Sequence, residues 1–171
     1  MNDTQKPVHI ALVTDAWLPQ VNGVVRTLQT TIGMLEERGH RVTVISPLDF
    51  RTIPCPTYPE ISLSLLPKKR LTARLKALNP DCIHVATEGP LGLATRGYCR
   101  KAGLPFTTAF HTRFAEYIAA RTPIPESWGY LFLRWFHKPS KAVMVPSGSM
   151  IDTLKEKGFT NAVLWTRGVN L

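Results

Sequence analysis

The sequence predicts an α/β protein with a Rossmann-like, doubly wound and mostly parallel sheet that carries helices on both faces. Short apolar runs rich in β-branched residues alternate with longer stretches of helical periodicity, which is typical of parallel strands joined by helical crossovers. The chain has 171 residues, 44% of them hydrophobic, which is enough for one buried core and few for two. One domain is therefore expected over residues 8–171, after a flexible N-terminal segment at residues 1–7.

The first strand–helix–strand unit follows from three consecutive patterns. The apolar run Val8–Thr14 predicts a strand, and apolar residues at helical spacing predict a helix over Val24–Arg38. Gly39 suits the left-handed residue that ends many helices. The next apolar run, Arg41–Ser46, predicts the second strand.

Residues 47–60 contain four prolines in fourteen residues. Proline removes a backbone donor and fixes φ, so this segment is expected to be a loop without regular structure. The loop leads to a predicted third strand at Ile61–Leu66.

The rest of the chain continues the alternation. Further strands are predicted at Cys82–Ala86, Phe106–Phe110, Lys141–Val145 and Ala162–Trp165. Further helices are predicted at Lys68–Leu78, Leu91–Ala102, Thr112–Ala120, Ser127–His137 and Ser149–Lys157. The last helix is expected to start with the capping pattern Ser149-x-x-Asp152 and to end at Gly158. The final strand has no helix after it to close its unit, so the chain is expected to be one part of a longer protein.

Composition narrows the possible partners and compartments. The formal net charge is +9, from 21 Lys and Arg against 12 Asp and Glu, which favours nucleic acid, acidic lipid headgroups or phosphorylated small molecules. No apolar run is long enough to span a bilayer and the N-terminus lacks the layout of a secretory signal, so a cytoplasmic protein is expected. Three scattered cysteines without C-x-x-C spacing argue against a disulfide framework and a zinc site.

Three candidate site segments follow strands, and ligands of open parallel sheets bind beyond the carboxyl ends of strands. Asn22-Gly23 offers an adaptable backbone before a helix N-terminus, although an ordinary strand-to-helix turn explains it equally well. Glu88 follows a strand, where its carboxylate could face a crevice or could cap the next helix. His111, the candidate catalytic residue, ends a strand, where it could bind a hydroxyl or phosphate, exchange a proton near neutral pH, or be a satisfied structural residue.

Two other features concern surfaces and metals. The predicted helix at Lys68–Leu78 is cationic and amphipathic, with Lys68, Lys69, Arg70 and Arg74 around its apolar stripe, and Trp135 lies in a second basic and aromatic stretch. Such a helix can rest on anionic lipid or can pack on the sheet with a solvated face. No D-x-D pair occurs, so no metal site is expected.

Five stretches together resemble a known family. "TDAWLPQVNGVVRTL", "VATEGPLG", "FHTRFAEY", "VPSGSMIDTL" and "WTRGVNL" are similar, in order and spacing, to the N-terminal domain of family 4 retaining glycosyltransferases, particularly the bacterial α-mannosyltransferase-like members. The resemblance covers the chain from Val8 to Leu171. It implies one half of a GT-B fold, in which this half receives the acceptor and a C-terminal domain, absent from this chain, binds the nucleotide sugar.

The resemblance also implies roles for individual residues. The loop carrying Asn22, Gly23 and Val24 would approach the donor phosphates and sugar, and His111 would bind a hydroxyl of the transferred sugar. The acceptor side would be lined by the residues that fall in matching stretches: Asp15, Glu88, Arg113 and Tyr117. The family's phosphate-neutralising Arg and Lys and its Glu-x7-Glu element belong to the C-terminal domain, so this chain alone is expected to be inactive.

Two functions of different classes result. The first is the acceptor-side domain of an enzyme that moves a mannose- or glucose-like hexose from a GDP- or UDP-sugar to a lipid or glycan, without cofactor or metal and without nucleic acid. Under this hypothesis the surface residues Lys68, Lys69, Arg70, Arg74 and Trp135 could hold the enzyme at the inner face of the plasma membrane. The second is a stand-alone basic module that binds a phosphorylated ligand or an anionic membrane without catalysis. A dehydrogenase is disfavoured because the G-x-G-x-x-G fingerprint is absent.

Overall fold

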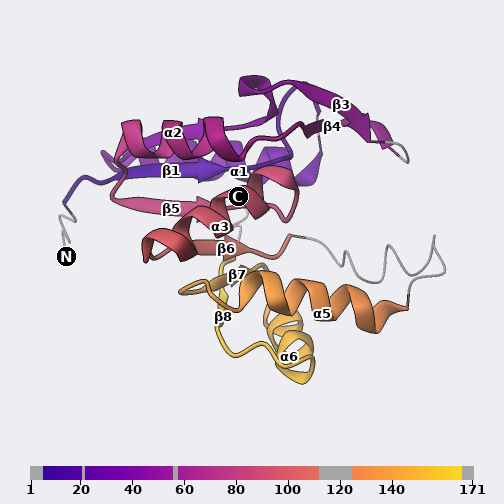
Figure 1. Ribbon diagram of the computed structural model, residues 1–171. Helices are drawn as coiled ribbons and strands as arrows, with labels where there is room; N and C mark the ends of the chain where they lie inside the picture. The colour runs from indigo at the N-terminus through magenta and orange to yellow at the C-terminus, as the bar shows by residue number, and fades with distance from the viewer. Residues whose placement is uncertain (1–5, 21, 56–57, 112–124, 167–171) are drawn as a thin grey trace.

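A computed structural model describes residues 6–20, 22–55, 58–111 and 125–166, without the side chains of residues 58–60. Its centre is a six-stranded sheet in which every neighbouring pair is parallel (Figure 1). In spatial order the strands are β2 (Arg41–Ile45), β1 (His9–Val13), β5 (Cys82–Val85), β6 (Thr107–Ala109), β7 (Val143–Val145) and β8 (Ala162–Leu164). The described helices are α1 (Gly23–Glu37), α2 (Lys68–Leu78), α3 (Pro90–Ala102), α5 (Glu126–His137) and α6 (Gly148–Glu156). The predicted α/β, Rossmann-like fold is confirmed.

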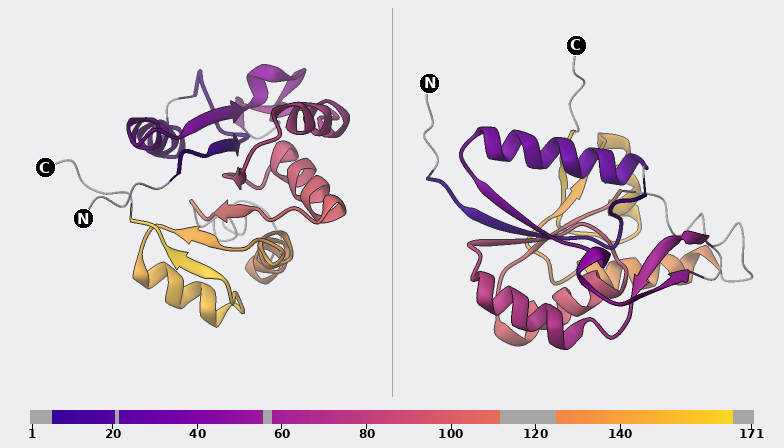
Figure 2. Two further views of the ribbon diagram at one scale, coloured as in Figure 1. Left: turned by 90° about the vertical axis from the view of Figure 1, so that its left-hand side faces the viewer. Right: turned by 90° about the horizontal axis from the view of Figure 1, so that it is seen from above.

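Helices cover both faces of the sheet because its strands are apolar on both sides. Leu12 of β1 packs with Leu28 of α1, whereas Ala11 of the same strand packs with Leu71 of α2 and Leu91 of α3. Figure 2 shows α1 on one side of the sheet and α2, α3 and α5 on the other. Successive residues of β1 therefore point to opposite faces of the sheet and pack against two different layers of helices.

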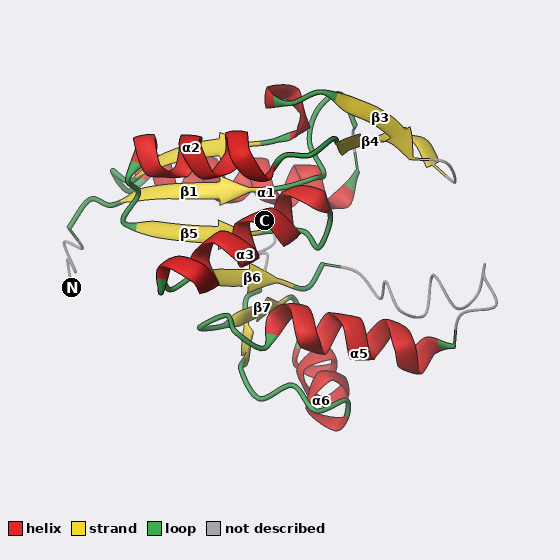
Figure 3. Cartoon of the chain, in the orientation of Figure 1, coloured by secondary structure: helices red, strands yellow, loops and turns green. Residues whose placement is uncertain are grey.

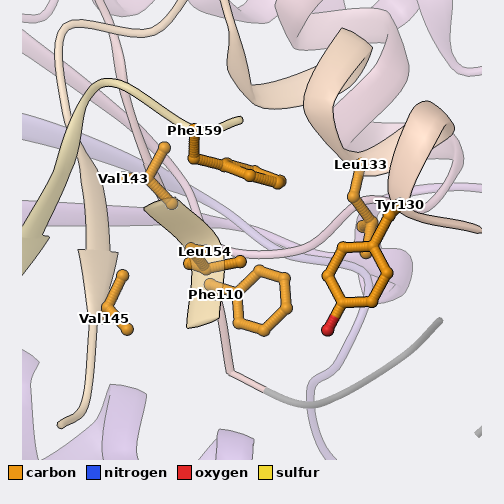
Figure 4. Close-up of a cluster of buried hydrophobic side chains, with 7 residues drawn as sticks. All are labelled: Phe110, Tyr130, Leu133, Val143, Val145, Leu154 and Phe159. Carbon is orange, nitrogen blue, oxygen red and sulfur yellow. The ribbon is translucent and has the colours of Figure 1, made fainter. Parts of the chain in front are cut away.

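The far end of the sheet has a core of its own. Phe110, after β6, packs with Val143 and Val145 of β7, with Leu133 of α5 and with Leu154 of α6 (Figure 4). The Phe110 and Phe159 rings meet edge to face, with centroids 6.4 Å apart. This cluster fixes β6, and with it the segment that leads to His111.

The proline-rich segment is not an irregular loop, so that prediction is wrong. It contains a 3-10 turn at Pro47–Asp49 and the strand β3 (Thr52–Cys55). β3 pairs antiparallel with β4 (Tyr58–Ser64) in a separate two-stranded sheet, and Pro54 lies opposite Ser62. A two-stranded ribbon tolerates proline because each strand is an edge strand with donors that need no partner. The predicted third strand thus belongs to a hairpin outside the main sheet.

Helix boundaries were predicted closely, with one wrong cap. Gly39 and Gly158 both have φ of +84° directly after their helices, as expected of left-handed terminators. The cap of α6, however, is Ser147, whose hydroxyl accepts a hydrogen bond from the Met150 backbone N–H, and Ser149 lies inside the helix. The predicted helix at residues 112–120 lies outside the described residues.

Candidate functional site

The loops after β1, β5 and β6 reach the same edge of the sheet, because these three strands are adjacent and parallel (Figure 3). The chain passes from β1 outward to β2 and later from β5 outward to β6, so the strand order reverses between β1 and β5. Such reversal points are where open α/β sheets bind ligands. The residues predicted at Gly23, Glu88 and His111 therefore lie on one rim.

Asn22 caps α1 and holds the start of the donor-loop candidate. Its side-chain oxygen accepts hydrogen bonds from the backbone N–H groups of Val24 and Val25, each at 3.0 Å. A Cβ added at Gly23 would find no atom within 4 Å, and Gly23 is not among the positive-φ glycines. Gly23 thus starts an ordinary helix turn that borders open space, and two of the helix's first donors are occupied by Asn22.

Asp15 joins the loop after β1 to the start of α3. Its Oδ1 accepts from the Leu91 N–H at 2.8 Å, and its Oδ2 accepts from the Gly92 N–H at 3.2 Å and the Thr87 hydroxyl at 2.9 Å. The residue is 6% exposed, and this burial raises the pKa of its carboxyl above the ordinary value. Asp15 is therefore the cap of α3, supplied by the loop after a distant strand.

The Asp15 cap explains the glycine before α3. A Cβ at Gly89 would lie 2.5 Å from the Asp15 Cγ, which is shorter than the contact distance of two non-bonded carbon atoms. The sequence could not reveal the pair, because 74 positions separate the two residues and no local pattern links them.

Glu88 does not cap α3, although capping was one of its two expected roles. Its Oε1 lies 3.2 Å from Nε2 of His137, which is fully buried in α5, and the other ring nitrogen of His137 lies 2.9 Å from the Thr108 hydroxyl. The Glu88 side chain remains 21% exposed. The rim carboxylate is thus held by a histidine that sequence reasoning did not single out, since His137 stands in an aromatic helix with no nearby motif.

His111 follows Phe110 at the end of β6 and is half-buried. Its ring lies edge to face with Trp165, with centroids 6.0 Å apart, and Trp165 makes a similar contact with His84 of β5 at 6.3 Å. Burial lowers the pKa of His84 to about 4, so this ring is neutral at pH 7. His84 and Trp165 are further residues that the sequence patterns did not single out.

The cationic surface forms a corner at the start of α2. Lys68, Lys69 and Arg70 are exposed, and Leu66 just before them is 94% exposed with a φ of +45°. We call Leu65, Leu66, Lys68, Lys69 and Arg70 the α2 corner. Arg74 lies outside it, because this side chain is half-buried in an ion pair with Asp49.

Trp135 is half-exposed on α5. The Arg96 guanidinium stacks 3.7 Å above its ring, and the same side chain donates to the Trp135 and Phe136 carbonyl oxygens. Arg113 and Tyr117, both expected on the acceptor side, lie outside the described residues.

Within the described ranges, no group of three or more His, Cys, Asp and Glu side chains could hold a metal ion. Each helix that the structure describes is too short or too polar to reach across a bilayer.

Comparison with known proteins shows the family. The profile of Glycosyltransferase Family 4 matches residues 21–171. A GDP-mannose-dependent alpha-mannosyltransferase of Corynebacterium glutamicum is 29% identical to this chain, and the match covers 96% of this chain and 44% of that protein. A protein of the same name from Mycolicibacterium smegmatis is 27% identical, and the match covers 96% of this chain and 48% of that protein. A sulfoquinovosyl transferase of Arabidopsis thaliana is 28% identical, and the match covers 96% of this chain and 36% of that protein.

Among solved structures, an alpha-glucosyltransferase in complex with UDP and DNA matches 82% of this chain and 37% of its own, with 14% identity and a TM-score of 0.49. The chain spans about half the length, or less, of the curated relatives named above. Because the family profile covers all but the first twenty residues, the chain belongs to Glycosyltransferase Family 4.

Proposed function

We propose that this chain is the acceptor-side domain of a retaining glycosyltransferase that moves a mannose- or glucose-like hexose from a nucleotide sugar to a lipid or glycan acceptor. The observation that carries the proposal is the family match over residues 21–171. It is supported by the strand pairing, which puts the loop after β1 and the segment after β6 at one edge of the sheet, where the resemblance expects a donor loop and a histidine. The named relatives include GDP-mannose-dependent enzymes, which supports a GDP- or UDP-sugar as donor.

Roles on the rim follow from this assignment. Asn22, Gly23 and Val24 border the donor's phosphates and sugar, and His111 binds a hydroxyl of the transferred sugar rather than acting as a base. Glu88, Arg113 and Tyr117 line the acceptor side, while Asp15 acts there through the loops that it joins. The charge on the leaving diphosphate is neutralised chiefly by groups outside this chain, so the chain alone does not catalyse transfer. For the same reason it does not need a metal ion of its own to balance that charge.

The α2 corner holds the enzyme at an anionic membrane from the cytoplasmic side. Two exposed leucines next to three exposed cations combine apolar burial with attraction to acidic headgroups, which is the arrangement of interfacial anchors. Trp135 adds an aromatic contact of the kind that favours membrane interfaces. The acceptor would then be presented by the surface on which the enzyme rests.

Transfer by the intact protein tests the proposal. With GDP-mannose or UDP-glucose and a membrane lipid extract, we expect labelled sugar in the product, and His111→Ala should lower kcat by about 100-fold or more through lost positioning. Asn161→Ala is a matched control, since Asn161 lies in the α6–β8 connection, where its side-chain amide donates to the carbonyl oxygens of His137 and Ser140 and to the Ser140 hydroxyl. Full transfer by His111→Ala would refute its role, and no transfer from any nucleotide sugar would favour a non-catalytic binding module.

A further inference from the structure

A groove beside the rim has no role in the function above. It lies between the loop after β1, which contributes Trp17, Leu18 and Gln20, and the segment after β2, which contributes Phe50 and Thr52. Its volume is about 230 Å³. Figure 1 shows the β3–β4 hairpin beyond the carboxyl ends of β1 and β5, so the groove opens at the same edge as the rim.

Both walls of the groove are fixed by the domain itself. Trp17 packs on the cluster of Leu12 and Leu28, and Phe50 packs on the cluster of Leu71 and Leu75. The turn before Phe50 is closed by the Asp49 carboxylate, which accepts from the Ser46 N–H at 3.0 Å and pairs with Arg74 of α2. The packing of the domain therefore shapes the groove, as is usual for small-molecule sites.

The lining has the chemistry of a sugar site. Trp17 and Phe50 supply aromatic side chains, and Gln20, Thr52 and Ser62 supply one amide and two hydroxyls. Among the described residues, none that lines the groove is charged, although the Arg70 guanidinium lies over the Phe50 ring at 5.7 Å and exposed Arg51 stands between Phe50 and Thr52. The lining itself offers no cation to a phosphate or carboxylate, whereas its aromatic and polar side chains match the apolar face and the hydroxyl edge of a neutral ring.

The position suggests the acceptor rather than the donor. Gln20 accepts a hydrogen bond from the Asn22 side chain at 3.3 Å, so the groove is joined to the cap of α1. On its outer side, Leu48 is exposed, and the Leu65 N–H donates to the Arg51 carbonyl at 2.8 Å, which brings the α2 corner next to this wall. The groove thus lies between the donor loop and the surface proposed to meet the membrane.

We propose that this groove binds a neutral hexose or polyol ring of the acceptor, an inference that rests on the proposed function. The ring lies against Trp17 and Phe50, and its hydroxyls bond to Gln20, Thr52 and Ser62. The same ring chemistry can come from a free glycan or from a glycolipid headgroup.

Binding of free rings is the first test, and it needs no donor. Saturation-transfer NMR of the intact protein with methyl α-mannopyranoside, methyl α-glucopyranoside and myo-inositol should give a signal for at least one of them. Phe50→Leu and Thr52→Val should weaken its binding by at least about threefold, because each removes one ring or hydroxyl contact. Trp17→Phe keeps the core packing and should have an intermediate effect, whereas Trp128→Phe, on the exposed part of α5, should have none.

A second experiment distinguishes a free glycan from a glycolipid headgroup as the source of the ring. Mannosyl- or glucosyl-diacylglycerol in phosphatidylcholine vesicles replaces the free ring, and the same variants are compared by vesicle sedimentation. Weaker binding of both forms supports a ring site that serves either source. Loss of vesicle binding without any free-ring signal would overturn the assignment and leave an apolar contact only.

Kinetics distinguish failure of this inference from failure of the proposed function. In the intact enzyme, Phe50→Leu and Thr52→Val should raise the acceptor KM by about threefold or more and leave the donor KM unchanged. Normal acceptor KM in both folded variants would overturn the groove while sugar transfer itself still stands. Ring binding in a protein that transfers no sugar would uphold the groove and refute the enzyme.

Discussion

The Asp15 cap and the α2 corner show two opposite ways of placing polar and apolar groups. Around Asp15, buried polar atoms are each matched with a donor or acceptor, and the Asp15 carboxylate itself leaves no room for a Cβ at Gly89. At the α2 corner, leucines and cations are exposed, and Leu66 has a backbone conformation that leucine rarely adopts. A substitution in the first region should therefore change stability, and one in the second should change binding.

Asp15→Ala should have the largest effect. Removal of the carboxylate leaves the Leu91 and Gly92 N–H groups buried without a partner, so the free energy of unfolding should fall by about 2–3 kcal/mol. Urea denaturation followed by circular dichroism measures it. Asp152→Ala, an exposed position on α6, is the control and should change stability little.

Gly89→Ala should cost about 1–3 kcal/mol, because the new methyl group meets the Asp15 carboxylate. In the background of Asp15→Ala, most of that cost should disappear, and a double-mutant cycle measures the difference. Gly97→Ala is a matched control on α3, since nothing lies within 4 Å of its added Cβ and alanine favours helix. Strictly additive effects of Asp15→Ala and Gly89→Ala would contradict the proposed contact.

Leu66→Asn tests the α2 corner without harming the fold. Asparagine accepts the left-handed backbone more readily than leucine, so stability should be unchanged or slightly raised. Binding to vesicles of phosphatidylglycerol and phosphatidylcholine should weaken by about tenfold, because one leucine no longer enters the apolar layer. Leu104→Asn, at a half-exposed leucine in the α3–β6 connection, should leave vesicle binding as it was.

Charge reversal at Lys68, Lys69 or Arg70 should weaken vesicle binding by about 1 kcal/mol or less per native charge removed, and the effect should shrink at high salt. Lys155→Glu on α6 is the matched exposed control. Unchanged sedimentation with anionic vesicles for all three reversals would remove the membrane role of the corner.

The smallest expected effect is on pH dependence. Since burial raises the pKa of Asp15 in the folded state, the folded protein binds more protons than the unfolded chain between the ordinary carboxyl pKa and the raised one. The contribution of Asp15 to stability is therefore fully present at low pH and decreases as pH rises through that window. The stability difference between the native protein and Asp15→Asn, measured from pH 3 to 7, should show this decrease. A difference that grows with pH would mean that the carboxylate is better stabilised than its burial implies.

Much of the fold could be predicted because the signals were local. The helix at Lys68–Leu78 was placed to the residue, since its apolar spacing and its flanks lie within one short segment. Gly39 and Gly158 were recognised as terminators because the left-handed backbone favours glycine whatever the surroundings. The hairpin was missed because proline rules apply to central strands, and only pairing decides that a strand is an edge.

The candidate site divides in the same way. The sequence by itself determined that three loop segments follow parallel strands, which places Asn22, Glu88 and His111 on one edge. Only the tertiary structure decided which partners the side chains at this edge contact. Asp15 caps a helix that begins 75 positions further along the chain. His137 pairs with Glu88, and the Trp165 ring lies against His111. The physical reason is that strand direction and helix ends follow from neighbouring residues, whereas hydrogen bonds and ring contacts between distant residues exist only once the core has brought them together.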